Sequence, residues 1–228
     1  MSIINVSTAI QQNFVSYRYP TVNVFHTQYA QRKALTYMSR LTRLTPELLT
    51  TEQKQTYDAL TTGPRGANMI QSDGSLGGPF NSMLYSPTIG IALQELGARL
   101  RYGTSIPRPL LELAIITIGA HWQAQYEFWA HARMALEAGI KQEVVTAIQL
   151  GEKPELDGSE ALVYEFCIQM IETKRIREDT YKELTEALGE VGIMEIATLI
   201  GYYSAISIVL NTFEISVPEN ASPPFKKT

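Results

Sequence analysis

The sequence predicts an all-α fold, and three observations lead to that prediction. Apolar residues recur at helical spacing in long blocks, whereas the alternation with a period of two that is typical of strands is nowhere sustained. Proline or threonine stands near the start of several blocks and glycine near their ends, as is common at helix termini. The chain has 228 residues, 45% of them hydrophobic, so it can bury one sizeable core without covalent staples.

The N-terminal part of the chain differs in composition from the rest. Residues 1–43 are polar and aromatic without a clear period, and we interpret them as an N-terminal arm. Residues 44–228 are predicted to form one helical domain. Its first helix is expected within 44–60, with Thr50 or Thr51 as the N-cap.

A glycine-rich segment separates this helix from the next. Residues 61–80 contain five glycines, two prolines and an Asp-Gly turn signal, which predicts a loop. A loop of this length in a compact domain is usually functional or disordered. The next helix is expected in 86–106, with Ser86 as its N-cap and Pro87 at its first position.

The longest helical block spans residues 107–140, and we expect a break near His121 and an end at Gly139. Further helices are predicted in three later segments. These are 141–154, 159–175 and 177–215, the last with a break near Gly192.

Two short segments resemble each other. ELAIITIG (112–119) and EIATLIG (195–201) both place a glutamate before an apolar helix. A duplicated helical unit explains this echo, and so does the similar composition of any two buried amphipathic helices.

Charge and leader composition exclude several classes of protein. The net charge of −4 and the absence of a basic run predict no binding to nucleic acid. The first residues lack the pattern of a signal peptide. The apolar stretch 196–210 is shorter than the roughly 20 residues that a membrane span needs, so it is interpreted as a buried helix. We therefore expect a cytoplasmic protein with no membrane partner.

The chain contains one cysteine, Cys167, within YEFCIQM. One thiol forms no intramolecular disulfide and supports no dithiol chemistry. We interpret it as a small buried apolar residue.

Three residues form the candidate catalytic site. In EFWAH (127–131), Glu127 and His131 are four residues apart and share one helix face. Glu112 lies nineteen residues before His131, inside the apolar run LLELAII. If the block folds back near His121, Glu112 meets His131 across two packed helices. A buried carboxylate requires a partner, and a Glu–His–Glu cluster in an apolar pocket suits proton transfer.

Two alternatives compete with catalysis at this cluster. Glu–His pairs four residues apart are also common as surface pairs on helices. His121, Glu127 and His131 could together bind a metal, but their spacing matches no known ligand pattern and no HExxH sequence occurs, so we predict no metal site.

The segment ELAIITIGAHWQAQYEFWAHARMALEAGI resembles the central motif of the carboxymuconolactone decarboxylase family. That family shares its fold with the alkylhydroperoxidase D proteins. Flanking segments such as DGSLGGPFNSML and SPTIGIALQELGARLR look similar to its longer members, and the resemblance covers roughly residues 44–216. It implies an alkylhydroperoxidase D-like helical bundle that assembles as a homo-oligomer, a trimer or a hexamer.

The resemblance also separates two chemistries. The peroxidase branch of the family uses a glutamate, a CxxC pair and a histidine. Glu112 and His131 match the glutamate and the histidine, but the two cysteine positions fall on Ala124 and Glu127. Without thiolates, that peroxidase chemistry is excluded. A glutamate at the second cysteine position resembles the decarboxylase branch.

The resemblance thus implies a cofactor-free decarboxylase, isomerase or cyclase that acts on a small cyclic, carboxylated or enolisable compound such as a lactone. Glu127 and His131 would exchange protons, and Glu112 would orient His131. The alternative is a non-catalytic small-molecule-binding or scaffold protein that keeps the fold.

Further residues are candidates for substrate binding. They are Phe80 and Asn81 in a loop that could close over the pocket, His121, Trp122 and Tyr126 near the catalytic cluster, and Tyr202, Tyr203 and Asn211 in the apolar helix. Each has a structural alternative, as a plain turn, a core side chain or a bridge between helices. Arg99 and Arg101 could attract a carboxylate or simply face solvent.

Overall fold

The computed structural model describes residues 39–63, 66 and 69–226 of the chain. All of them belong to one compact unit, Tyr37–Thr228. Most of the predicted arm, residues 1–38, lies outside the described residues.

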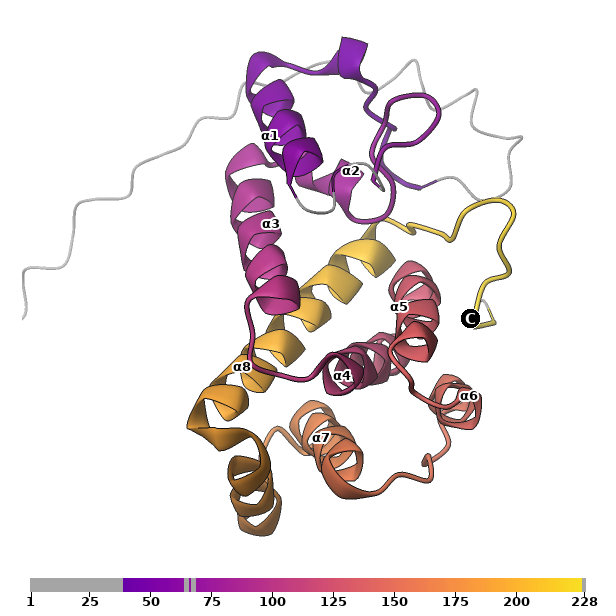
Figure 1. Cartoon of the computed structure of the whole chain (residues 1–228). Helices are drawn as coiled ribbons and strands as arrows, with labels where there is room; N and C mark the ends of the chain where they lie inside the picture. Colours follow the sequence, from indigo (N-terminus) through magenta and orange to yellow (C-terminus); the bar gives the residue numbers. More distant parts are fainter. Residues whose placement is uncertain (1–38, 64–65, 67–68, 227–228) are drawn as a thin grey trace, which may run out of the picture. The chain divides into compact units, whose positions relative to one another are not determined.

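The described residues are helical, with no strand and one isolated antiparallel bridge between Ile70 and Leu76. Figure 1 shows the elements in chain order. They are η1 (Pro46–Leu48), α1 (Thr51–Thr62), α2 (Phe80–Met83), α3 (Pro87–Tyr102), α4 (Arg108–His121), α5 (Gln125–Glu137), α6 (Gln142–Leu150), α7 (Gly158–Ile168), the π-helical turn η3 (Gln169–Thr173) and α8 (Glu178–Thr212). The all-α prediction is confirmed.

Local signals explain where several helices begin and end. Thr50 caps α1 in a capping box with Gln53, as one of the two predicted caps. Ser86 and Pro87 stand at the predicted start of α3, although the Ser86 side chain makes no capping hydrogen bond. The predicted loop 61–80 is shorter than expected, because α1 extends to Thr62 and α2 begins at Phe80.

Helix α4 is the centre of the bundle and contacts α5, α6, α7 and α8. Ten of its fourteen residues are buried, which explains why its sequence is apolar on every side. Leu111, Ala114 and Ile118 belong to the larger core, whereas Leu113 and Ile116 belong to a second core shared with α5 and α6. Its one acidic residue, Glu112, is therefore inside the protein.

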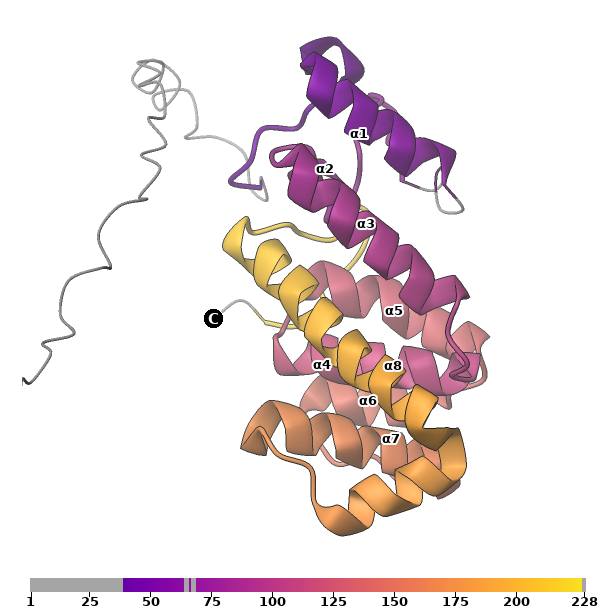
Figure 2. The same cartoon turned by 90° about the vertical axis from the view of Figure 1, so that its left-hand side faces the viewer.

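Helix α8 packs along α3, α4, α5 and α7, as Figures 1 and 2 show. It is kinked at Gly189, whose φ of 70° is left-handed, so the predicted break near Gly192 is displaced by three residues. Gly192 itself is helical and buried. Among the described residues α8 is the one helix long and apolar enough to cross a membrane. That is weak evidence for a span, because a core helix meets the same criterion.

Both ends of the described chain are fixed onto the bundle. Near the start, Ser39 and Arg40 bond to the carbonyl of Phe213 at the end of α8. Near the other end, Phe225 exchanges two hydrogen bonds with Gln125, and its ring packs on Phe128. The last residues of the predicted arm are therefore bonded to the helical domain.

The echo between 112–119 and 195–201 falls on α4 and α8, which pack together. Glu112 is buried in an ionic cluster, whereas Glu195 accepts hydrogen bonds from the backbone and side chain of Ser105. The two glutamates thus have different contacts, and the duplicated unit stays a prediction.

Candidate active site

The centre of the site is a histidine between two glutamates. His131 Nδ1 lies 2.6 Å from Oε2 of Glu112, and His131 Nε2 lies 3.1 Å from Oε1 of Glu127. All three side chains are buried, Glu112 completely. The structure therefore brings together the three residues that the sequence nominates, and it does so inside the protein.

The turn between α4 and α5 makes this meeting possible. Residues 122–124 reverse the chain, with Gln123 in the left-handed region at φ 48°. Gly119 packs directly against the backbone of Phe128, where an added Cβ would lie 3.4 Å from the Phe128 nitrogen, in ordinary contact. Tight packing of α4 on α5 places Glu112 beside His131.

Two arginines complete the cluster. Arg108 Nε lies 2.7 Å from Oε1 of Glu112, one turn along α4. Arg101 reaches in from α3, with Nη2 3.8 Å from the same oxygen and Nη1 3.3 Å from Nε2 of His131. The Arg101 side chain is only 8% exposed, whereas that of Arg108 is 45% exposed.

Opposing influences set the charge of Glu112. Burial disfavours its ionised form, but the hydrogen bond with His131 and the positive charges nearby outweigh burial and lower its pKa. An ionised Glu112 accepts a hydrogen bond, so Nδ1 of His131 carries the proton that faces it. This fixes the ring and directs Nε2 toward Glu127.

The pKa of His131 also differs from that of an ordinary histidine. Burial disfavours its charged form, but the negative charge of Glu127 and the hydrogen bond with Glu112 outweigh burial and raise the pKa of His131. An imidazole held between two carboxylates in this way can both donate and accept protons.

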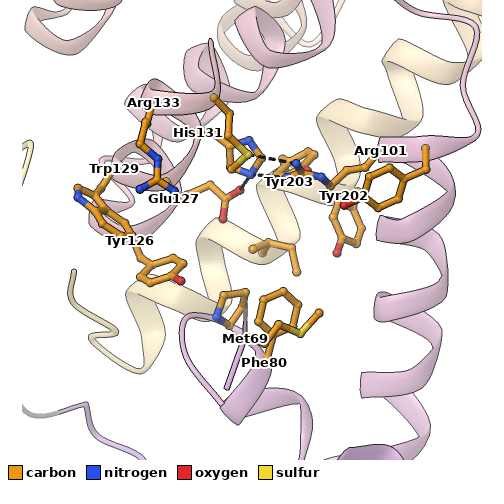
Figure 3. A pocket seen from close by; sticks show the side chains of 15 residues that line it. Met69, Phe80, Arg101, Tyr126, Glu127, Trp129, His131, Arg133, Tyr202 and Tyr203 are labelled. Atoms are coloured by element: carbon orange, nitrogen blue, oxygen red, sulfur yellow. Dashed lines mark hydrogen bonds and ion pairs between the residues drawn. The ribbon is translucent and has the colours of Figure 1, made fainter. Parts of the chain in front are cut away.

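A cavity of about 460 Å³ lies in front of His131, as Figure 3 shows. This volume is within the range of small-molecule sites. The lining comes from the loop before α2 and from α2, α3, α5 and α8. It consists of Met69, Pro79, Phe80, Arg101, Tyr102, Tyr126, Glu127, Trp129, Ala130, His131, Arg133, Met134, Tyr202, Tyr203 and Ile206.

Aromatic rings form much of the cavity wall. Tyr203 stands edge-on to His131, with ring centroids 5.2 Å apart, and Tyr202 packs on Tyr203. Burial raises the pKa of Tyr126 to about 12 and the pKa of Tyr203 well above its ordinary value. These phenols are neutral at physiological pH, so they act as walls and hydrogen-bonding groups.

The loop before α2 is fitted to this wall. Gly78 has a φ of 56°, and a Cβ at this position would clash with the ring of Tyr126. Glycine is therefore required twice, for its backbone conformation and for the close approach of the ring. The following residues, Pro79 and Phe80, line the cavity.

The predicted site residues divide into two groups. Glu127 and His131 line the cavity together with Phe80, Tyr126, Tyr202 and Tyr203, and Glu112 lies behind His131. Four other candidates are not part of the lining: Asn81, His121, Trp122 and Asn211.

The contacts of these four explain their absence from the cavity. Asn81 binds the backbone of Leu44 and Thr42, so it anchors the segment before α1. Asn211 donates to the carbonyl of Trp122 and so joins α8 to the α4–α5 turn. His121 is exposed at the end of α4 and packs edge-on against Trp122. The contacts of these residues match the structural alternatives to substrate binding, namely a turn, a core side chain or a bridge between helices.

Arg101 is a cavity residue whose burial the sequence did not reveal. It lies on one side of α3 with Gly90, Gln94 and Gly97, which are all buried. Arg99, two residues earlier in the same helix, is exposed. Glycine and glutamine do not mark a buried face in a sequence, so no local pattern separates the two arginines.

The cysteine and the possible metal ligands of the described residues can be placed in the structure. Cys167, the one cysteine of the chain, is buried in α7, and burial raises its pKa to about 12. Within the described ranges no three His, Cys, Asp or Glu side chains are grouped as metal ligands.

No protein-family model and no curated protein matches the chain. Two solved structures have a similar fold. One is the alkylhydroperoxidase AhpD core of an uncharacterized peroxidase-related protein from Ralstonia eutropha JMP134, with a TM-score of 0.64 and 14% identity over 82% of this chain and 95% of the other. The second is a cysteine-to-alanine variant of the debrominase Bmp8 in complex with 2,3,4-tribromopyrrole, with a TM-score of 0.60 and 16% identity over 80% and 95% of the two chains. The chain therefore has the all-α fold of AhpD-like proteins, as its sequence predicts.

Proposed function

We propose that the protein is an acid–base enzyme that needs no cofactor and acts on a small cyclic compound that is carboxylated or enolisable. The observation that carries this proposal is the buried chain Glu112–His131–Glu127, in which His131 and Glu127 line the cavity and Glu112 is bonded to Nδ1 of the imidazole. The bundle holds the histidine in one orientation and presents its reactive nitrogen to a ligand-sized space.

Decarboxylation is the first reaction that suits this geometry. The bond to the carboxylate breaks, carbon dioxide leaves, and the electron pair enters the conjugated system as an enolate. Protonated His131 then gives its Nε2 proton to the carbon, and solvent restores that proton afterwards. One carboxylate is lost and one proton is gained, so the reaction requires neither an oxidant nor a reductant.

Isomerisation or ring closure uses the same groups in a different order. Neutral His131 or ionised Glu127 removes a proton next to a carbonyl, and the resulting acid returns a proton at another carbon. Glu112 stays ionised throughout and stabilises the imidazolium, because its oxygen is 2.6 Å from Nδ1. Its role is positioning, since it lies behind the ring.

The cavity wall favours a compact, planar substrate. The rings of Phe80, Tyr126 and Tyr203 line the cavity together with His131. Where these rings displace water, they strengthen the charge interactions beside them.

The test is turnover in heavy water of carboxylated lactones and cyclic β-keto acids, followed by mass spectrometry. We expect loss of carbon dioxide with gain of one deuterium, or deuterium uptake without loss of carbon. Glu127→Gln and His131→Ala should each lower the rate by about 10²–10⁴-fold, the usual contribution of a general acid or base.

The control variant is Glu137→Gln, which changes an exposed glutamate of the same helix. It should react at the wild-type rate. Folded Glu127→Gln and His131→Ala variants that also react at the wild-type rate would refute the proposal. Binding without turnover, weakened only as much as folding stability is, would favour a non-catalytic binding protein.

A further inference from the structure

Nε2 of His131 lies between two groups with opposite demands. Glu127 Oε1, at 3.1 Å, accepts a hydrogen bond only if Nε2 carries a proton. Arg101 Nη1, at 3.3 Å, donates one only if Nε2 has a free lone pair. Figure 3 shows both contacts. The protonation of His131 therefore decides which neighbour it bonds.

The guanidinium of Arg101, next to His131, has one N–H donor without a hydrogen-bond partner. Its side chain is more than nine-tenths buried and lines the cavity, yet its Nε has no hydrogen-bond partner in the described part of the chain. Its Nη2 contacts the weakly accepting sulfur of Met134, at 3.1 Å. A buried guanidinium donor without a partner costs free energy. Nε is closed to solvent here, so an anionic oxygen in the cavity would satisfy it once the guanidinium turns toward the ligand.

The charged side chains around His131 come from helices α3, α4 and α5. When both glutamates are ionised, Glu112 and Glu127 balance Arg101 and Arg108, and protonation of His131 makes the cluster positive. Arg133 also lines the cavity but is 70% exposed. The facing tyrosines, Tyr102 and Tyr126 as well as Tyr202 and Tyr203 on α8, are phenols that carry no charge in their ordinary form.

We propose that Arg101 is the anion-binding residue of the cavity, and that binding of a carboxylate to it is coupled to uptake of one proton by His131. The bound anion satisfies the Nε donor and offsets the guanidinium charge, which otherwise repels an imidazolium 3.3 Å away. His131 then takes up a proton on Nε2 and, through that N–H, donates a hydrogen bond to Glu127.

The coupling deepens the proposed function, on which it rests for taking the cavity as the reaction site. Binding of an anionic substrate would itself protonate His131, the general acid. The proton that later replaces the lost carboxyl group is therefore on His131 as soon as the substrate is bound. An uncharged substrate would leave His131 in its basic form.

Benzoate is a suitable probe, because it is a planar carboxylate, and benzamide is its uncharged counterpart. Calorimetry of the full chain in two buffers with different ionisation enthalpies measures affinity and proton uptake together. We expect benzoate to bind at least about tenfold more tightly than benzamide, as for one charge-assisted hydrogen bond. Benzoate should take up protons at pH values above the free pKa of His131, and its affinity should fall as the pH rises further.

Variants assign these effects to residues. Arg101→Gln should weaken benzoate binding by about 10–100-fold and leave benzamide binding unchanged. Arg101→Lys, which keeps the charge without the Nε donor, should restore part of the affinity. His131→Gln should abolish proton uptake. Arg99→Gln, which removes an exposed charge from the same helix, should behave as the wild type.

Three results would overturn the inference: no binding of benzoate to the wild type, wild-type affinity in a folded Arg101→Gln variant, or binding without proton uptake across the titration of His131. The proposed function fails separately. Proton-coupled benzoate binding without turnover of any compound would support anion binding by Arg101 and refute the proposed enzymatic function. Turnover that is unaffected in the Arg101→Gln variant would support the enzymatic function and refute the role of Arg101.

Discussion

Helix α5 carries two ionic pairs with the same spacing and opposite surroundings. On its inner side, Glu127 and His131 are 5% and 7% exposed and face the cavity. On its outer side, Arg133 and Glu137 are 70% and 68% exposed, with 3.7 Å between their closest charged atoms, although Arg133 also borders the cavity. Spacing of four residues brings side chains together, but it does not decide what the pair does.

The surroundings make the difference. Water and ions screen the outer pair, so its charges influence little beyond themselves. The inner pair is desolvated and connected to Glu112 and Arg101, which makes each charge dependent on the others. The same pattern in the sequence thus yields a solvated surface pair or a network that can move protons.

The strongest way to break the inner network is to remove its most buried member. Glu112→Ala leaves His131, Arg101 and Arg108 without their shared counter-charge. We expect a loss of about 3–5 kcal/mol in the free energy of unfolding, as for one partner removed from a buried ion pair. Urea denaturation measures it.

The isosteric variant Glu112→Gln separates charge from packing. It keeps the volume and should lose less stability than Glu112→Ala. Equal, small losses in both variants would show that Glu112 is solvated in solution, contrary to its complete burial here.

The dependence of stability on pH is expected to be smaller, on the order of 1 kcal/mol for each unit of pKa shift. The raised pKa of His131 means that its contribution is complete below the ordinary value of 6.5 and is lost as the pH rises through the folded-state pKa. The lowered pKa of Glu112 means that its contribution is present above 4.5 and is lost as the pH falls through the folded-state pKa. Together they are most stabilising between pH 4.5 and 6.5.

Unfolding curves of the wild type and His131→Gln across this range test the sign. The stability difference between the two proteins should shrink as the pH rises above 6.5. A difference that instead grows toward alkaline pH would mean that His131 is neutral in the folded protein.

The sequence predicts the helices and the buried cluster better than it predicts the break in α8. Helices, the reversal after His121 and the meeting of Glu112 with His131 follow from apolar periodicity and from the cost of burying a carboxylate. The break in α8 was misplaced by three residues: Gly189 has the positive φ, whereas Gly192 is helical and buried. Gly189 is exposed and has no neighbouring atom within reach of an added Cβ, so no tertiary contact marks it.

The cavity wall was harder to predict than the Glu112–His131–Glu127 cluster. Asn81 and Asn211 are polar side chains with hydrogen-bond partners 37 and 89 residues away in the chain, the backbone N–H of Leu44 and the backbone carbonyl of Trp122. Local pattern does not contain such pairings. Arg101 was undervalued for the same reason, since its burial depends on how α3 lies against α5 and α8.

The smallest effect is expected on the outer side of α5. Glu137→Ala removes the partner of Arg133 at an exposed position, and exposed helix pairs of this spacing contribute about 0.3–0.5 kcal/mol. Alanine also favours the helix slightly more than glutamate does, so the net change in unfolding free energy should be close to zero and should decrease further in high salt. Paired urea denaturations at low and high ionic strength measure this. A loss comparable to that of Glu112→Ala would mean that α5 buries its outer face against a partner, and the contrast between its two sides would then disappear.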